Sequence, residues 1–85
     1  MQTLEANARN ARVAGLVEGL LARGGRRVAA APDARLADLG LNSADMVDLM
    51  LSVEAEFDVT IPQREITPEN FLTVSAIERL LDRLA

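Results

Sequence analysis

Apolar residues recur at helical spacing in the amino-terminal part of the chain. They form an i, i+3, i+4, i+7 set at Val13, Leu16, Val17 and Leu20. This spacing predicts an amphipathic helix over about residues 4–23, because it places the four side chains on one face. Gly24 and Gly25 then end the helix, since glycine readily adopts the left-handed backbone of a helix C-terminus. Gly15 and Gly19 lie inside it, and we expect them to mark a close contact with another helix.

A long connection separates this helix from the next one. It runs from Gly24 to about Asn42 and contains the turn-forming pair Pro32 and Asp33. We expect four apolar residues to anchor it against the helices: Val28, Leu36, Leu39 and Leu41. A loop of this length is unusual in so short a chain and is more often functional than not.

A second amphipathic helix is predicted over residues 43–57. Its apolar face is built from residues that recur about every four positions: Met46, Leu49, Met50, Val53 and Phe57. Ser43 is a favoured residue at a helix N-terminus. Asp45 lies in the first turn, where a negative charge complements the positive end of the helix dipole.

Val47 and Leu51 form a second apolar row on this helix, offset from the core-facing stripe and bordered by Asp48 and Glu54. Two interpretations of this row are open. It is either the edge of the core or a small hydrophobic contact surface for a visiting enzyme.

Two further helices are predicted in the carboxy-terminal part. Residues 58–62 are too short and Pro-terminated for a central strand. A short helix is expected over residues 67–71, with a capping threonine and proline at its first position. Thr73 caps a last helix with one apolar face, made of Val74, Ile77, Leu80, Leu81 and Leu84. The predicted fold is all-α: a four-helix bundle in a single domain over residues 1–85, with a long loop between helices one and two and a short third helix.

Composition narrows the possible functions. The chain has 85 residues, of which 49% are apolar and 26% charged, as in folded domains with a small core. Cysteine and histidine are absent, which excludes disulfides, thiol catalysis and a Ser-His-Asp arrangement within the chain. No apolar run approaches the roughly 20 residues of a membrane span. We therefore expect a cytoplasmic protein that is monomeric on its own and has no membrane partner.

Charge is unevenly distributed. Residues 1–35 contain six arginines and three acids, whereas residues 36–85 contain three arginines and ten acids. The acidic run from Asp38 to Asp58 is either a solvated helix face or a docking surface for basic partners, whose encounter rate it would raise. Nucleic acid is not an expected ligand, because the arginine-rich region is short, lacks aromatic residues and belongs to an acidic chain.

Ser43 is the main candidate for chemistry. At the start of a helix its hydroxyl is exposed beside free backbone N–H groups, which favours an attached phosphate-linked group. The alternative is that Ser43 only caps the helix. A third possibility, a serine hydrolase, lacks a base, since the chain contains neither histidine nor lysine.

The order of these features resembles the acyl carrier proteins. The matching features are the long helix, the long loop, Leu39-Gly40-x-x-Ser43, the acidic helix, Glu54-Ala55-Glu56-Phe57, Ile61-Pro62 and the two final helices. The resemblance covers most of the chain and is densest over residues 36–62. It implies an acyl-carrier-like bundle in which Ser43 is the attachment site of 4′-phosphopantetheine, an arm whose thiol carries a substrate as a thioester. It further implies a carrier and not an enzyme, modified by a separate phosphopantetheinyl transferase.

Two residues beside Ser43 depart from the fatty-acid type of this family. Asn42 stands where an aspartate is typical, and Ala44 where a leucine is. The run from Leu41 to Met50 is similar to aminoacyl carrier proteins, which implies loading by a dedicated adenylating ligase and delivery to acyl-transfer enzymes. The residues expected to face these partners are Asn42, Ala44, Asp45, Val47, Asp48, Leu51 and Glu54.

One alternative belongs to a different class. The bundle is then an unmodified adaptor that binds a basic partner through the acidic face of the helix over residues 43–57. This hypothesis requires Asp45, Asp48 and Glu54 for function but not the hydroxyl of Ser43.

Overall fold

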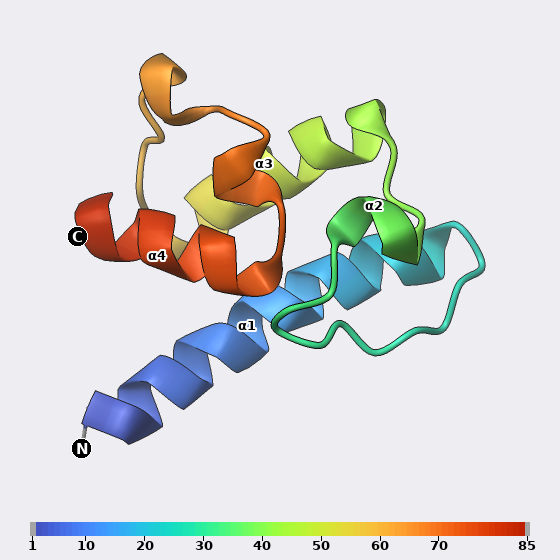
Figure 1. Ribbon diagram of the computed structural model, residues 1–85, viewed down its shortest axis with the longest axis horizontal. Helices are drawn as coiled ribbons and strands as arrows, with labels where there is room; N and C mark the ends of the chain where they lie inside the picture. Colours follow the sequence, from blue (N-terminus) through green and yellow to red (C-terminus); the bar gives the residue numbers. More distant parts are fainter. Residues whose placement is uncertain (1, 85) are drawn as a thin grey trace.

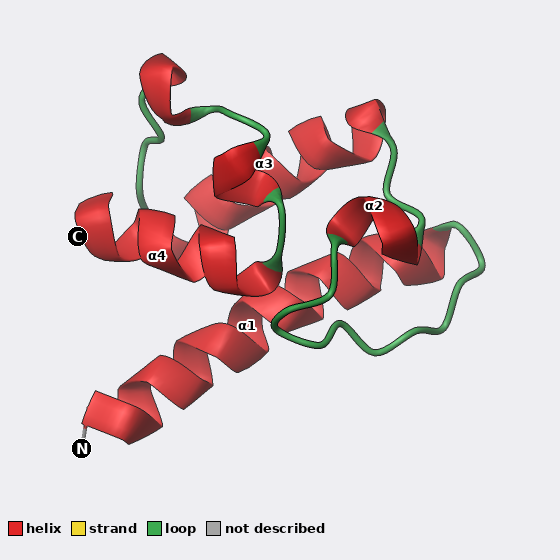
Figure 2. Ribbon diagram, in the orientation of Figure 1, coloured by secondary structure: helices red, strands yellow, loops and turns green. Residues whose placement is uncertain are grey.

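The computed structural model describes residues 2–84 and, from residue 8 onward, their side chains. Within this range the chain forms four α-helices and two single-turn 3₁₀ helices (Figures 1 and 2). In chain order they are α1 (Gln2–Arg23), α2 (Leu36–Leu39), α3 (Ser43–Phe57), η1 (Gln63–Glu65), η2 (Glu69–Phe71) and α4 (Val74–Leu84). The all-α prediction is confirmed, and α3 has the predicted bounds. Met1 and Ala85, the ends of the predicted domain, lie outside the described residues.

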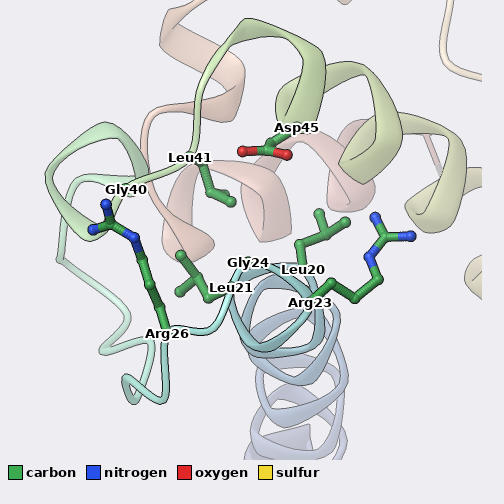
Figure 3. A pocket seen from close by; sticks show the side chains of 8 residues that line it. All are labelled: Leu20, Leu21, Arg23, Gly24, Arg26, Gly40, Leu41 and Asp45. Atoms are coloured by element: carbon green, nitrogen blue, oxygen red, sulfur yellow. The ribbon is translucent and has the colours of Figure 1, made fainter.

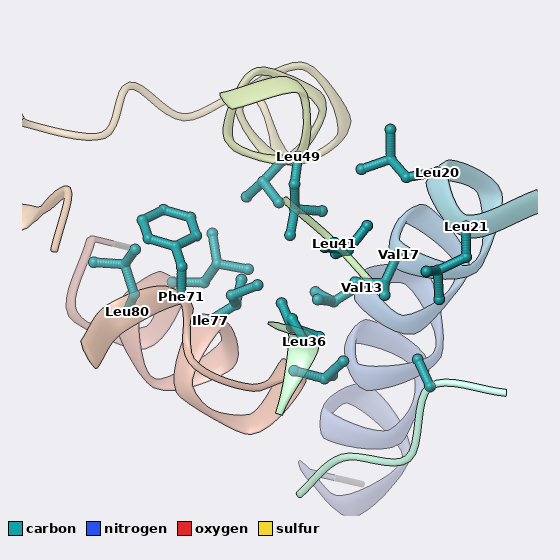
Figure 4. Packing of buried hydrophobic residues seen from close by; sticks show 14 of the residues in the cluster. Val13, Val17, Leu20, Leu21, Leu36, Leu41, Leu49, Phe71, Ile77 and Leu80 are labelled. Atoms are coloured by element: carbon teal, nitrogen blue, oxygen red, sulfur yellow. The ribbon is translucent and has the colours of Figure 1, made fainter. Parts of the chain in front are cut away.

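The core lies where α1 meets α3 and α4 (Figure 4). Side chains from all three helices are completely buried there: Val13 and Val17, Leu49 and Val53, and Val74, Ile77 and Leu80. These residues occupy the apolar faces predicted from helical spacing. Fully burying one such aliphatic side chain stabilises the fold by about 1.5–3 kcal/mol, so these faces determine how the helices pack.

The long connection between α1 and α3 is tied to the bundle at several points. The Ala30 N–H donates to the Glu18 carboxylate at 2.8 Å, and the Leu36 N–H donates to the Leu72 carbonyl at 3.0 Å. Leu36 and Leu41 are buried as predicted, and Leu39 packs partly buried against the core. The prediction for Val28 is wrong, because 41% of this residue is exposed. Ala30 is buried in its place.

Short helical turns in the connections differ from the prediction. The connection contains α2, whose four residues are too few to give a periodic signal. The short helix expected over residues 67–71 is reduced to the 3₁₀ turn η2, although the Thr67 hydroxyl accepts from the Asn70 N–H as a cap at 3.2 Å. Thr73 caps α4 as predicted, accepting from the Ala76 N–H at 3.0 Å.

Gly15 and Gly19 do not make the expected helix contact. Both are exposed, and a Cβ atom built on either would have no neighbour within 4 Å. The prediction is wrong because the packing face of α1 is the one that carries Val13 and Val17, and the glycines lie outside it. Residues 2–84 also include no helix with the length and apolar content needed to cross a bilayer.

We therefore expect Gly15→Ala and Gly19→Ala each to raise the free energy of unfolding by about 0.5–1 kcal/mol, because alanine is the better residue in a helix interior. Urea unfolding measures this change. Gly40→Ala is the matched control and should be destabilised, since the φ of Gly40 is +114° and alanine is strained there. A loss of stability in the α1 variants would show that the glycines do make a contact.

Candidate functional site

Ser43 is the first residue of α3, and its side chain is exposed. The helix is capped by its neighbour: the Asn42 side-chain oxygen accepts from the Asp45 N–H at 2.9 Å, and the Asp45 carboxylate accepts from the Asn42 N–H at 3.1 Å. This reciprocal pair is a capping box. The interpretation of Ser43 as the helix cap is therefore wrong.

Because Asn42 caps the helix, the Ser43 hydroxyl is left available for chemistry. None of the hydrogen bonds among the described residues involves it. Ser43 and Ala44 lie in the first turn of α3, where backbone N–H groups have no acceptor inside the helix, so they favour a negative group at this end. An exposed alcohol beside such donors fits a phosphodiester. The described residues contain no cluster of three or more acidic side chains that could hold a metal ion.

An open, largely apolar groove begins beside Ser43. Its volume is about 620 Å³, and it lies between α3 and the segment from Ile66 to Leu72. Met46, Val47 and Met50 line the α3 side, while Ile66 and Leu72 are 44% and 45% exposed on the opposite wall. Sequence reasoning missed Ile66 and Leu72 as site residues, because they lie outside the regular helices and have no periodic pattern.

A polar cluster holds the wall of this groove opposite α3. The Glu65 carboxylate accepts from the Arg83 guanidinium at 3.1 Å and from the Asn70 side-chain amide at 3.1 Å. Arg83 also donates to the Asn70 side-chain oxygen at 3.0 Å. The hydrogen bond from Arg83, with smaller contributions from its charge and from Asn70, lowers the pKa of Glu65 below its ordinary value. Through Glu65 of η1 and Asn70 of η2, the cluster ties both ends of this segment to Arg83 of α4.

Val47 and Leu51 lie on the solvent side of α3. They are 54% and 53% exposed, whereas Leu49 and Val53 on the opposite side are completely buried. The interpretation of the Val47 and Leu51 row as the edge of the core is therefore wrong. Ala44 is also exposed, so a row of exposed apolar side chains runs along α3 from the turn that carries Ser43.

The acidic residues of α3 are engaged within the molecule. Asp45 belongs to the capping box, and Asp48 pairs with Arg23 at 3.4 Å. The Glu54 carboxylate accepts from the Ile61 N–H at 2.8 Å and holds the loop that follows the helix. Glu56 pairs with Arg12 at 2.9 Å. The structure thus gives Asp45 and Glu54, which the sequence assigned to the partner face, roles in holding the fold.

Comparison with known proteins identifies close similarities. A family model for the phosphopantetheine attachment site matches residues 11–82. Aminoacyl carrier protein 1 of Bradyrhizobium diazoefficiens is 52% identical over 81 residues, which cover 95% of this chain and 89% of the relative. Aminoacyl carrier protein 2 of the same organism is 47% identical over 81 residues, covering 95% and 90%.

Two solved structures are similar in both fold and sequence. One is a chain in the crystal structure of the Bradyrhizobium japonicum glycine:[carrier protein] ligase complexed with glycylated carrier protein. It is 49% identical with a TM-score of 0.80, and the match covers 86% of this chain and 97% of that chain. The other comes from the same ligase complexed with its cognate carrier protein and an analogue of glycyl adenylate. Its identity is 47% and its TM-score 0.82, with coverage of 89% and 97%.

The Glu65 cluster predicts a pH-dependent contribution to stability. Because the pKa of Glu65 in the folded protein is below the ordinary value of 4.5, its bonds stabilise the fold above about pH 4.5. That contribution is lost as the pH falls from 4.5 toward the lowered pKa. Glu65→Gln should therefore reduce the free energy of unfolding at pH 7, and the difference from wild type should shrink on acidification.

Urea unfolding between pH 7 and pH 3 measures this difference. In an Arg83→Gln background, Glu65→Gln should lose most of its pH dependence, because the donor that lowers the pKa is gone. A Glu65→Gln effect that is the same at every pH would show that the carboxylate is not stabilised by these bonds.

Proposed function

We propose that 4′-phosphopantetheine is attached to Ser43, because this chain belongs to the aminoacyl carrier proteins of the acyl carrier family and matches the family model for the phosphopantetheine attachment site. When bound, the arm supplies the thiol that carries an aminoacyl group as a thioester. The protein itself carries and presents the group and does not transform it. A phosphopantetheinyl transferase installs the arm, and downstream acyl-transfer enzymes receive the cargo.

The observation that carries this proposal is the exposed, unbonded hydroxyl of Ser43 at the start of a helix that another residue caps. The phosphodiester formed there would lie beside the N–H groups of Ser43 and Ala44, at the positive end of the α3 dipole. Ser43 needs no base of its own, because the transferase activates its hydroxyl. This agrees with a chain that has neither histidine nor lysine.

The loading enzyme is a dedicated amino acid:[carrier protein] ligase. The relatives of known structure are complexed with a glycine-activating ligase, and we propose glycine as the first cargo to test. The ligase docks on the exposed row of α3 that contains Ala44, Val47 and Leu51, since this row leads directly to Ser43. The adaptor hypothesis receives less support, because Asp45, Asp48 and Glu54 are engaged within the chain.

Intact mass spectrometry tests the attachment site. Wild-type protein incubated with a phosphopantetheinyl transferase and coenzyme A should gain the mass of one 4′-phosphopantetheine group, and Ser43→Ala should gain none. Ser52→Ala, which removes another hydroxyl of α3, is the matched control and should be modified like wild type. Ser43→Ala should unfold within about 0.5 kcal/mol of wild type, because its hydroxyl makes no bond in the fold. An unmodified wild type, or a modified Ser43→Ala, would contradict the proposal.

Substitutions in the exposed row test ligase docking. Leu51→Ala should raise the KM of the loading ligase for the modified protein several-fold, with the free energy of unfolding nearly unchanged, because Leu51 is 53% exposed. Leu49→Ala on the buried side of α3 is the control and should cost about 2–5 kcal/mol of stability. If Leu51→Ala leaves KM unchanged, this row is not the docking surface.

A further inference from the structure

Three arginines form a cluster at the end of α1 and in the turn that follows it. We call Arg23, Arg26 and Arg27 the basic corner; all three are exposed. Arg23 pairs with Asp48 at 3.4 Å. Among the described side chains, Arg26 and Arg27 have no carboxylate within ion-pair distance, unlike Arg9, Arg12 and Arg83. The chain has a net charge of −4, so this cluster is a basic patch on an acidic protein.

The guanidinium of Arg26 lies against the backbone of Gly40. A Cβ atom on Gly40 would be 2.6 Å from Nη1 and 2.8 Å from Cζ of Arg26, so the guanidinium would have to shift if another residue stood at this position. Gly40 ends α2 with a φ of +114°, which is also a backbone conformation suited to glycine. The side chain therefore spans from the end of α1 to the turn that leads into α3 (Figure 3).

A hollow of about 270 Å³ lies between the end of α1, Gly40 and the first turn of α3. Arg23 and Arg26 stand on opposite sides of a floor that includes Leu20, Leu21 and Leu41 (Figure 3). Asp45 is the one carboxylate in its lining, and it already accepts the Asn42 N–H. Arg23 is paired with Asp48, so Arg26 is the guanidinium of this lining that has no carboxylate within ion-pair distance among the described side chains.

The basic corner is continuous with the row of α3 on which the ligase is proposed to dock. The ion pair between Arg23 and Asp48 connects the corner to α3 next to Val47, and Gly40 precedes Ser43 by three residues. An extended chain of three residues spans at most about 11 Å. The basic corner thus adjoins the surface that a partner on the exposed row would cover.

We propose that the basic corner receives a carboxylate side chain of the loading ligase, bound in the hollow by Arg26, while Arg27, its neighbour in the chain, adds a second positive charge. This inference rests on the proposed function, since it names a second contact of the same complex. A guanidinium presents paired N–H donors that match the two oxygens of a carboxylate. The alternative is that a basic group of the ligase binds the acidic residues of α3. It receives less support, because these acids already have partners within the chain: Asp45, Asp48, Glu54 and Glu56.

Steady-state loading of the modified protein by the Bradyrhizobium japonicum glycine:[carrier protein] ligase tests this contact. The double variant Arg26→Gln/Arg27→Gln keeps long polar side chains and removes two charges. It should raise KM about tenfold with kcat unchanged, and kcat/KM should depend less on salt concentration than in wild type. Arg26→Lys, which keeps the charge but not the paired donors, should show a smaller rise in KM and the wild-type salt dependence.

Arg64→Gln/Arg79→Gln is the matched control. It removes two exposed arginines that also lack a described carboxylate partner but lie on η1 and α4, away from the hollow. A control with the same rise in KM would overturn the proposal, because net charge alone would then explain the effect. An unchanged KM in Arg26→Gln/Arg27→Gln would overturn it too.

Two further measurements separate this inference from the proposed function. Thermal unfolding of every variant reports whether the fold is intact, and the single variant Arg27→Gln, which does not touch Gly40, should raise KM in an unperturbed fold. Intact mass confirms that each variant carries the arm before kinetics are measured. If the wild type gains the arm and glycine, and Arg26→Gln/Arg27→Gln is loaded with the same KM, only the proposed role of the basic corner is refuted. A wild type that gains neither would refute the proposed function and the corner with it.

Discussion

The site depends on two reciprocal hydrogen bonds at the start of α3. Asn42 and Asp45 satisfy each other's backbone N–H groups, and the helix begins at Ser43 without using the serine hydroxyl. If Ser43 were the cap, its hydroxyl would be turned back onto the helix and attachment of an arm would remove the cap. Because the neighbour takes that role, the alcohol is exposed and makes no hydrogen bond among the described residues. The contacts that begin the helix are thus separate from the serine hydroxyl.

The burial of Leu49 and Val53 then decides which side of α3 is available to a partner. These residues pack against the core, so Val47 and Leu51 are left exposed on the opposite side, in line with Ala44. The acids of α3 also make contacts within the chain. They hold the helix start, the loop at Ile61 and the neighbouring helix α1. The side of α3 opposite the core therefore presents exposed apolar side chains, Val47 and Leu51 among them.

The connections carry much of the specificity of the fold. Backbone hydrogen bonds from Leu36 to Leu72 and from Ser75 to Pro32 join the long loop to the carboxy-terminal part. The Glu65 cluster holds the opposite wall of the groove to α4. Neither set of contacts follows from local spacing, because each joins residues far apart in the chain. Both fix irregular segments that no helical spacing predicts.

Local patterns predict the helices and single out Ser43 as the candidate for attachment, because both depend on residues close together in the chain. Helical spacing identifies the core faces of α1, α3 and α4, and the absence of histidine and lysine limits the chemistry that the chain can perform unaided. The same patterns do not decide whether Val47 and Leu51 are core or surface, which of Asn42 and Ser43 caps α3, or whether Gly15 and Gly19 meet another helix. They also give no indication that Arg26 reaches Gly40. Spacing states which residues share a face, but only the packing of distant segments determines which face is covered and what each side chain meets.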